Sequence, residues 1–341
     1  MVYTEHEPFK PEKVVGVAAA ALEQNLVIAA PFAREGIEPF KGSKDDTINV
    51  TVDGVLPYRT YGWRNNRSAP LQFDVYKERK VARSFGDDLY SGVELTDEQA
   101  TMDFDGWTKL AGKQVEAIGR GYEVKATRAI EDAPYEVHVV LSESDLRGSL
   151  NRLKVVFDRL QVPGNRTLYV GDDLEIALLD DDKLNLASNV GDAEAETALR
   201  EATLGRRSGF NFVKAQHLSD MNYGLFDSGF VFITAAPPVP QSAGFGATAS
   251  TPDGTALRWV RAFDINYGVE KSVFMAYHSF DVVRDILVGL DEDDQAYVSE
   301  DEHFVRGVRV ELGSTFSVEV SNPELSAISG IVSTDGTSDG A

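Results

Sequence analysis

The sequence contains no cysteine among its 341 residues, and it is poor in basic residues. Without cysteine there can be no disulfide framework, no thiolate metal site and no thiol nucleophile. Lys and Arg number 33 against 55 Asp and Glu, which leaves a net charge of −22. Because phosphate backbones bind basic surfaces through counterion release, we expect the chain as a whole to be repelled by nucleic acid. Solubility is the ordinary explanation of such a charge, although it would also suit a wall that confines nucleic acid without binding it.

The chain also lacks an uninterrupted hydrophobic run. Residues 14–32 form an apolar segment of 19 positions, but Glu23, Gln24 and Asn25 break it. The segment is therefore a poor membrane span, and it lacks the basic start and the cleavage pattern of a signal peptide. We expect a soluble protein made in the cytoplasm. With 43% hydrophobic residues, the chain is long enough for two or three folded modules.

Motifs that carry chemistry are absent as well. The sequence has no GxxxxGK[ST] loop, no HExxH and no GxSxG. His278, Ser279 and Asp281 include the residue types of a hydrolytic triad, but neighbours on one strand alternate faces and cannot converge unaided. The acidic runs 180–182 and 291–294 lack the alternating spacing of a calcium loop. We predict no catalytic residue, no cofactor and no metal ion.

One long amphipathic helix stands out among the features that are present. Apolar residues recur at steps of three or four, at Trp107, Ala111, Val115, Ile118, Tyr122, Ala126 and Ile130. The pattern predicts a helix over residues 106–131, about 39 Å long, which Pro134 prevents from continuing. We expect this helix to be the spine of the subunit. A long core helix in any α/β protein is the simpler alternative.

A long hairpin is predicted before this helix. Residues 47–61 and 71–85 alternate apolar and polar positions as strands do. The turn-rich segment between them contains Trp63, Arg64, Asn65, Asn66 and Arg67. Two long strands joined by such a tip do not form a core of their own, so we expect the hairpin to project and contact a partner. The alternative is an edge hairpin folded onto its own domain.

The remaining segments have weaker but readable patterns. We expect helices at residues 10–24 and 144–160, and a short helix through Leu179 capped by Asp172 or Asp173. Strands are expected at 136–142, from Arg166, and at 209–218, 230–236, 256–268, 271–290, 303–312 and 316–320. Residues 87–102 are interpreted as an acidic approach to the long helix, residues 241–255 as a surface loop, and the last residues as disordered.

In their order and spacing, these segments resemble the major capsid proteins of tailed bacteriophages. The resemblance is carried by residues 40–52, 150–179, 202–218 and 255–285, and it covers roughly residues 10–312. It implies an α+β chain with the HK-ninety-seven-type capsid fold, which encapsulin shells share. The implied parts are an N-terminal arm (1–45), an extended hairpin loop (46–86), a peripheral domain with the spine helix (87–135), an axial domain (136–254), peripheral-domain return strands (255–312) and a C-terminal tail (313–341).

The resemblance also implies a function. The chain would be a major capsid protein that assembles, as hexamers and pentamers, into an icosahedral shell enclosing double-stranded DNA without sequence-specific binding. It would reside in the virion after assembly in the host cytoplasm, with a scaffolding protein, a portal and decoration proteins as partners and no membrane. Trp63, Arg64, Asn65, Asn66 and Arg67 would form a subunit interface, with Trp63 as the apolar anchor.

Two alternatives remain from the sequence. An encapsulin-type nanocompartment shares the fold but holds enzyme cargo. An enzyme of unidentified chemistry is the weaker alternative, because the sequence shows no site for it. Some capsid proteins crosslink a hairpin-loop lysine to a neighbour's asparagine. The segment from Gly62 to Pro70 has no lysine, so we expect a noncovalent shell.

Overall fold

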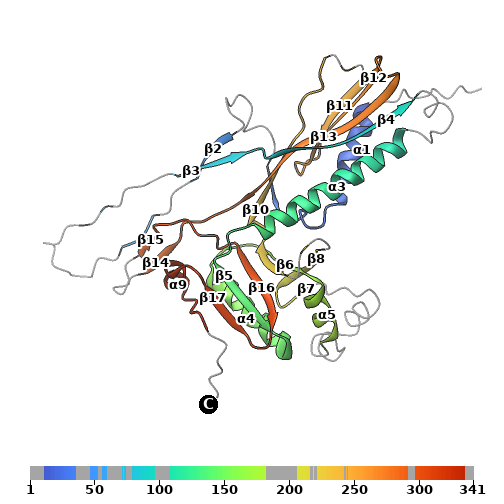
Figure 1. Ribbon diagram of the computed structural model, residues 1–341. Coiled ribbons are helices and arrows are strands. Elements are labelled where there is room, and N and C mark those ends of the chain that lie inside the picture. The colour runs from blue at the N-terminus through green and yellow to red at the C-terminus, as the bar shows by residue number, and fades with distance from the viewer. Residues whose placement is uncertain are drawn as a thin grey trace, which may run out of the picture. The chain divides into compact units, whose positions relative to one another are not determined.

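A computed structural model describes residues 11–35, 47–52, 56–59, 71, 73, 79–96, 107–181, 206–215, 218, 221–241, 243, 245–290 and 296–334 (Figure 1). The chain divides into two compact units, each assembled from three separated segments. The first unit comprises Met1–Ile48, Arg83–Arg128 and Val231–Asp281, and the second comprises Asn49–Ala82, Ala129–Phe230 and Val282–Ala341. The described helices are α1 (Pro11–Gln24), α3 (Trp107–Glu131), the short 3-10 helix η2 (Glu143–Asp145), α4 (Leu146–Arg159), α5 (Asp172–Asp180) and α9 (Pro323–Ser329).

A six-stranded sheet forms the first unit, in the order β1-β10-β13-β12-β11, with β4 also paired to β13. Its strands are β1 (Ala33–Glu35), β4 (Asp87–Thr96), β10 (Phe230–Ala235), β11 (Phe245–Ser250), β12 (Ala256–Asp264) and β13 (Val269–Val282). The 14-residue β13 is the central strand, because its residues 269–275 pair antiparallel with β12 along one edge and its residues 269–278 pair with β4 along the other.

One face of this sheet is covered by helices. Buried and half-buried residues alternate along β13, with Phe274, Ala276 and His278 on the buried side. From α3, the Gln114 side-chain amide donates to the backbone carbonyls of Ser91 on β4 and Ser272 on β13, both at 2.9 Å. The predicted long helix is therefore present within one residue of its expected bounds, and its apolar stripe is buried from Ala111 to Ile130.

The second unit is a seven-stranded mixed sheet in the order β17-β5-β16-β9-β6-β8-β7. The β5–β16 and β6–β8 pairs are parallel and the other pairs are antiparallel. The strands are β5 (Val137–Ser142), β6 (Arg166–Val170), β7 (Arg206–Arg207), β8 (Phe210–Lys214), β9 (Asn222–Phe226), β16 (Gly307–Gly313) and β17 (Ser317–Val320). A separate two-stranded sheet pairs β14 (Val288–Leu290) with β15 (Ala296–Val298).

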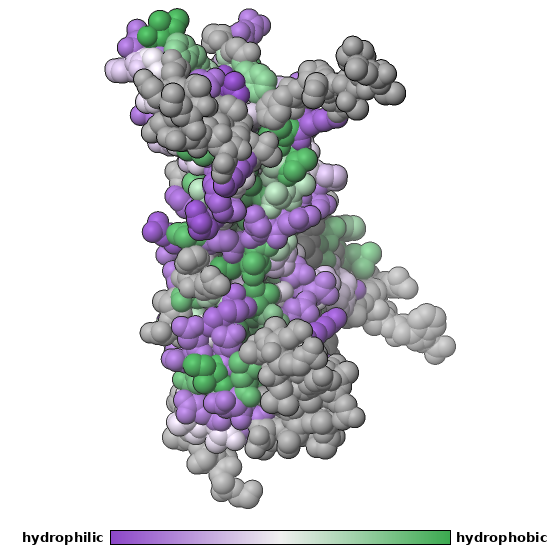
Figure 2. All heavy atoms as spheres, turned by 90° about the vertical axis from the view of Figure 1, so that its right-hand side faces the viewer, coloured by the Kyte–Doolittle hydropathy of each residue, from purple (hydrophilic) through white to green (hydrophobic). Residues whose placement is uncertain are grey.

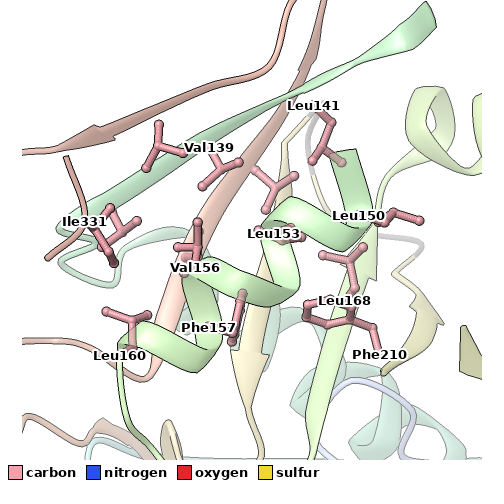
Figure 3. Close-up of a cluster of buried hydrophobic side chains, with 14 of the residues drawn as sticks. Val139, Leu141, Leu150, Leu153, Val156, Phe157, Leu160, Leu168, Phe210 and Ile331 are labelled. Carbon is pink, nitrogen blue, oxygen red and sulfur yellow. The ribbon is translucent and has the colours of Figure 1, made fainter. Parts of the chain in front are cut away.

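Helix α4 supplies the apolar face that covers this sheet (Figure 3). Leu150, Leu153 and Phe157 are fully buried, at the spacing of one helix face. The Phe157 ring lies 5.2 Å from the Phe210 ring and 5.1 Å from the Phe226 ring, centroid to centroid. The Asp145 side chain caps the helix by accepting from the Gly148 backbone N–H. The helix expected at residues 144–160 is confirmed, with η2 as its first turn.

Three local interpretations of the sequence were wrong. Residues 87–96 of the expected acidic approach form β4, and residues 245–250 of the expected surface loop form β11. Both strands depend on pairing with partners distant in sequence, which outweighs their acidic or Gly/Ser/Thr-rich composition. Gly171, rather than an aspartate side chain, occupies the N-cap of α5.

The C-terminal segments also differ from expectation. Residues 255–312 were expected to return to the peripheral domain, but β16 pairs with β5 and β9 in the seven-stranded sheet. The strand expected at residues 316–320 is present as β17, whereas helix α9 was not expected in the segment interpreted as a tail. Asn322 caps α9 by accepting from the Glu324 N–H at 3.0 Å, and Gly330 ends it with φ of 64°. No described helix is long and apolar enough to cross a membrane.

Candidate assembly surfaces

The five residues that the sequence singles out as an interface lie outside the described residues. These are Trp63, Arg64, Asn65, Asn66 and Arg67. Their geometry therefore stays a prediction. The base of the hairpin that carries them is described, because β2 (Thr47–Val52) and β3 (Arg79–Ser84) pair in a two-stranded sheet.

The described positions between β2 and β3 carry exposed hydrophobic side chains. Leu56, Tyr58 and Leu71 are each more than half exposed, and Phe73 is 89% exposed. Scattered exposed apolar residues are ordinary, but several along one segment are typical of an interaction surface. Fully burying one such side chain contributes about 1.5–3 kcal/mol. The stem of the hairpin thus has apolar surface available for a partner.

A second apolar projection is the turn that joins β12 to β13, residues 263–268, which we name the knob. Phe263, Ile265 and Tyr267 are 51%, 86% and 77% exposed. The connection between β12 and β13 lies at the upper end of the ribbon in Figure 1, and Figure 2 shows hydrophobic side chains among those at the upper end of the molecule. Residues 256–268 were expected to be strand throughout, so the knob is a feature that the sequence pattern did not predict. Its sequence signal is the pair of large side chains Ile265 and Tyr267 on either side of Asn266, in a turn, where polar residues are usual.

Asp264 organises the knob. Its backbone carbonyl accepts from the Gly268 N–H at 2.9 Å, and its carboxylate accepts from the Asn266 N–H at 3.0 Å. The other carboxylate oxygen accepts from Lys271 Nζ at 2.8 Å, and this ammonium lies 5.4 Å from the centre of the Tyr267 ring. The hydrogen bond from Lys271 lowers the pKa of Asp264, and the same bond raises the pKa of Lys271. Gly268 has φ of 62°, a conformation that favours glycine.

A concave surface lies between α1 and α3, and we name it the groove. It encloses about 370 Å³, and its apolar lining includes Val17, Ala18 and Ala21 of α1 and Ala111, Gly112 and Val115 of α3. Val17 is 71% exposed. A Cβ atom placed on Gly112 would meet no atom of the described residues within 4 Å, so these residues leave this wall open. Lys13 and Glu116 also line the groove.

The most concentrated group of titratable side chains is structural. His303 is completely buried, with Nδ1 2.8 Å from Glu136 Oε2 and Nε2 3.2 Å from Glu324 Oε2. Each ring nitrogen of His303 thus faces one carboxylate oxygen. The second oxygen of Glu136 accepts from the Phe304 N–H, and that of Glu324 accepts from the Glu300 N–H, both at 2.9 Å. This cluster, the histidine latch, ties α9 to the start of β5.

The electrostatics of the latch agree with this role. The backbone N–H of Glu300 is the largest influence that lowers the pKa of Glu324, and the hydrogen bond from His303 lowers it further. Every polar atom named in the latch already has a partner within the chain. The latch therefore stabilises the second unit and offers no open position for a substrate.

No described cluster converges for catalysis. His278 is buried against Tyr122, with ring centroids 5.3 Å apart, whereas Ser279 and Asp281 belong to the opposite face of β13. Over the described ranges, no three His, Asp or Glu side chains are placed to hold a metal ion. Residues 182 and 291–294 of the acidic runs lie outside those ranges.

Comparison with known proteins identifies the fold. No family model matches the chain, and no curated protein matches it. Among solved structures, the capsid of cyanophage P-SCSP1u matches with a TM-score of 0.57 and 10% identity, over 92% of this chain and 93% of that one. A structure from Mycobacterium phage Che8 matches with a TM-score of 0.53 and 12% identity, over 91% and 96%. The mature capsid of bacteriophage PhiM1 matches with a TM-score of 0.52 and 10% identity, over 92% and 90%.

These similarities cover nearly the whole of both chains at very low identity, so they are similarities of fold. The mixed α+β architecture predicted from the order of segments is confirmed. The chain has the HK-ninety-seven-type fold of tailed-bacteriophage capsid subunits.

Proposed function

We propose that this chain is a major capsid protein, the structural subunit of an icosahedral shell that encloses the double-stranded DNA of a tailed bacteriophage. The observation that carries the proposal is the match to capsid structures over nearly the whole of both chains. No large segment of this chain remains unmatched that could form a separate functional domain. Fold alone does not determine function, so the surfaces must also suit assembly.

The surfaces support a shell subunit. Exposed apolar residues gather on the hairpin stem and on the knob, where a monomer would gain nothing from them. The net charge of −22 suits a container for a polyanion, because its wall does not bind the nucleic acid it encloses. The described residues show no catalytic cluster, and we propose a structural role without enzymatic activity.

We propose a specific use for each part of the chain. Residues 46–86 form an extended loop whose tip reaches a neighbouring subunit, with Trp63 as the apolar anchor. Arg64 and Arg67 pair with carboxylates of that neighbour, and Asn65 and Asn66 complete the contact. Hexamers and pentamers are the assembly units, and the shell is noncovalent. A scaffolding protein, a portal and decoration proteins act as partners, and assembly in the host cytoplasm yields the virion.

Electron microscopy of the expressed chain tests this proposal. The chain is produced alone and together with a candidate scaffolding protein, and both samples are imaged in negative stain. We expect closed shells or rings of subunits in at least one sample. Assembly that depends on scaffold distinguishes a phage shell from an encapsulin-type compartment, which would close alone around cargo. A uniform small oligomer in both samples would overturn the proposal.

A further inference from the structure

We propose that the outer face of α4 on one subunit packs against the outer face of α5 on a second copy of this chain. This inference rests on the proposed shell function and specifies one of its contacts. Both helices belong to the second unit (Figure 1), so every copy presents one face of each kind.

The outer face of α4 is basic around one exposed apolar residue. Val155 is 50% exposed. Arg152 lies three positions before it and Arg159 four positions after it, so the three side chains share one side of the helix, and both arginines are exposed. Such a face is unusual in a chain with a net charge of −22.

The charge of this face is not cancelled within the chain. Arg159 donates to a backbone carbonyl at 2.9 Å, and Arg152 lies over an aromatic ring at 5.4 Å. Neither guanidinium forms an ion pair with any residue that the structure describes. Asp158, the one acidic residue of α4, is already paired with Arg166 at 2.5 Å. The two arginines are therefore available to carboxylates from outside.

The outer face of α5 has the opposite charge around its own exposed apolar residue. Ile176 is 58% exposed. Asp173 lies three positions before it and Asp180 four positions after it, again on one side of the helix and exposed. Asp172 is paired with Lys214, whereas Asp173 and Asp180 form no ion pair within the described part of the chain.

Asp180 also lies at an end of α5 that disfavours it. The carbonyl end of a helix carries a partial negative charge, so a carboxylate there is destabilising and a cation is stabilising. The last turn of α5 contains no basic residue. An arginine supplied by another subunit would offset this unfavourable charge.

The spacing of the two faces identifies the occupant. Each has a charged residue three positions before the apolar one and another four positions after it. Two parallel helices side by side therefore match Arg152 with Asp173, Val155 with Ile176, and Arg159 with Asp180. Both faces are exposed, so this match is not made within one chain and requires a second copy. Complementary charges around an apolar contact set its orientation and register.

The symmetry of such a contact suits a shell. Two different faces of the same subunit form a head-to-tail interface, which links copies into rings when the rotation closes. Each subunit then offers α4 to one neighbour and α5 to another.

The absence of cysteine allows a direct crosslinking experiment. A chain with Val155→Cys and Ile176→Cys is assembled and oxidised. Helices packed about 8–10 Å apart bring facing Cα atoms within the about 7 Å that a disulfide allows. We expect a ladder of linked chains on a denaturing gel. Leu290→Cys, at an exposed position of the same unit, replaces Val155→Cys as the control and should give at least about tenfold less product.

A charge swap in the crosslinking chain tests the register. Arg152→Glu places like charges opposite each other and should reduce the crosslink about tenfold or more. Adding Asp173→Lys to the same chain restores opposite charges and should recover most of the product. Arg147→Glu is the matched control, because Arg147 is an exposed residue of α4 away from this face, and it should leave the yield close to the parent. The melting temperature of each unassembled variant shows that it folds.

The outcomes separate this inference from the proposed function. Shells that form without the ladder overturn the α4–α5 contact and leave the shell function standing. Equal losses from Arg152→Glu and Arg147→Glu, or no recovery with Asp173→Lys, also overturn it. If the parent chain forms neither shells nor rings, the proposed function fails, and the crosslink in the small oligomer then decides whether the contact exists.

Discussion

The two units of this chain differ in where they leave apolar side chains exposed. In the described part of the second unit, the exposed hydrophobic residues outside the hairpin are isolated, one to a segment (Val155, Ile176, Leu290 and Val332), and only the hairpin stem carries a group of them. In the first unit, three of them share a single turn at the knob, and Val17 lies beside an open apolar groove. In the second unit, the buried His303 ring has a carboxylate partner at each of its two nitrogens.

This difference separates stability from assembly. An apolar residue packed inside a unit contributes to folding, whereas one held exposed by an ordered turn contributes only when a partner covers it. Changes in the second-unit core should therefore unfold the chain, and changes at the hairpin or the knob should leave it folded but unable to associate. Four predictions test this separation, in order of decreasing expected effect.

The largest effect is expected from Phe157→Ala. This ring is completely buried between Phe210 and Phe226, so its removal leaves a cavity and should destabilise the unassembled chain by about 3–5 kcal/mol. Val155→Ala, on the exposed side of the same helix, is the control and should change stability by less than about 0.5 kcal/mol. Chemical denaturation measures both. Equal effects of the two variants would contradict the assigned core.

The next effect is expected at the hairpin tip. Replacing Trp63, Arg64 and Arg67 together by Ala should weaken assembly by about 2 kcal/mol or more per interface, because aromatic and Arg anchors dominate such contacts. The melting temperature of the unassembled chain should stay at the parent value. Sedimentation at increasing protein concentration measures the loss. An unfolded variant, or one that assembles as well as the parent, would refute the interface role.

A smaller effect is expected from His303→Gln. The variant loses the imidazole ring that lies between two carboxylates and should destabilise the second unit by about 1.5–3 kcal/mol. His138→Gln is the control, because His138 makes a half-exposed pair with Glu311 at 3.2 Å that contributes about 0–1 kcal/mol. Hydrogen exchange of the α9 amides should increase in the first variant alone. Unchanged protection of α9 would show that the latch does not hold this helix.

The smallest effect is expected from acid. The pKa of Glu324 is lowered in the folded chain, so on acidification the unfolded chain binds its proton first. The stability that this carboxylate contributes is complete above the ordinary glutamate value of 4.5 and is lost as the pH falls through the lower folded value. Glu324→Gln should make stability less dependent on pH in this range. A parallel pH dependence in parent and variant would argue against a charged Glu324 in the latch.

Elements with a strong local pattern were predictable from the sequence. The apolar stripe from Ala111 to Ile130 predicted α3, and the stripe from Leu146 to Leu160 predicted α4. Each pattern repeats at the helix period over several turns, so it needs no knowledge of neighbours. β4 had a weaker signal, the alternation of Leu89, Ser91, Val93 and Leu95, which its acidic residues obscured.

Contacts between distant segments were not predictable in the same way. β11 is a strand because β12 lies beside it, and although a strand was expected at residues 316–320, its pairing with β5 was not. The histidine latch joins residues 136, 303 and 324, and the groove joins α1 to α3 across about ninety residues of sequence. No periodicity relates such positions, since their proximity results from chain packing.

The sequence by itself therefore determined most helices, most strands and the absence of cysteine chemistry, which follow from residue type and local period. The α+β class was implied by the resemblance to capsid proteins. Only the tertiary structure decided which strands share a sheet, that residues 313–334 belong to the second unit, and that an ordered turn holds Ile265 and Tyr267 in solvent. Burial and exposure depend on how the chain packs. An apolar residue of the same type can therefore lie in a core or at an interface, and its type alone does not distinguish the two.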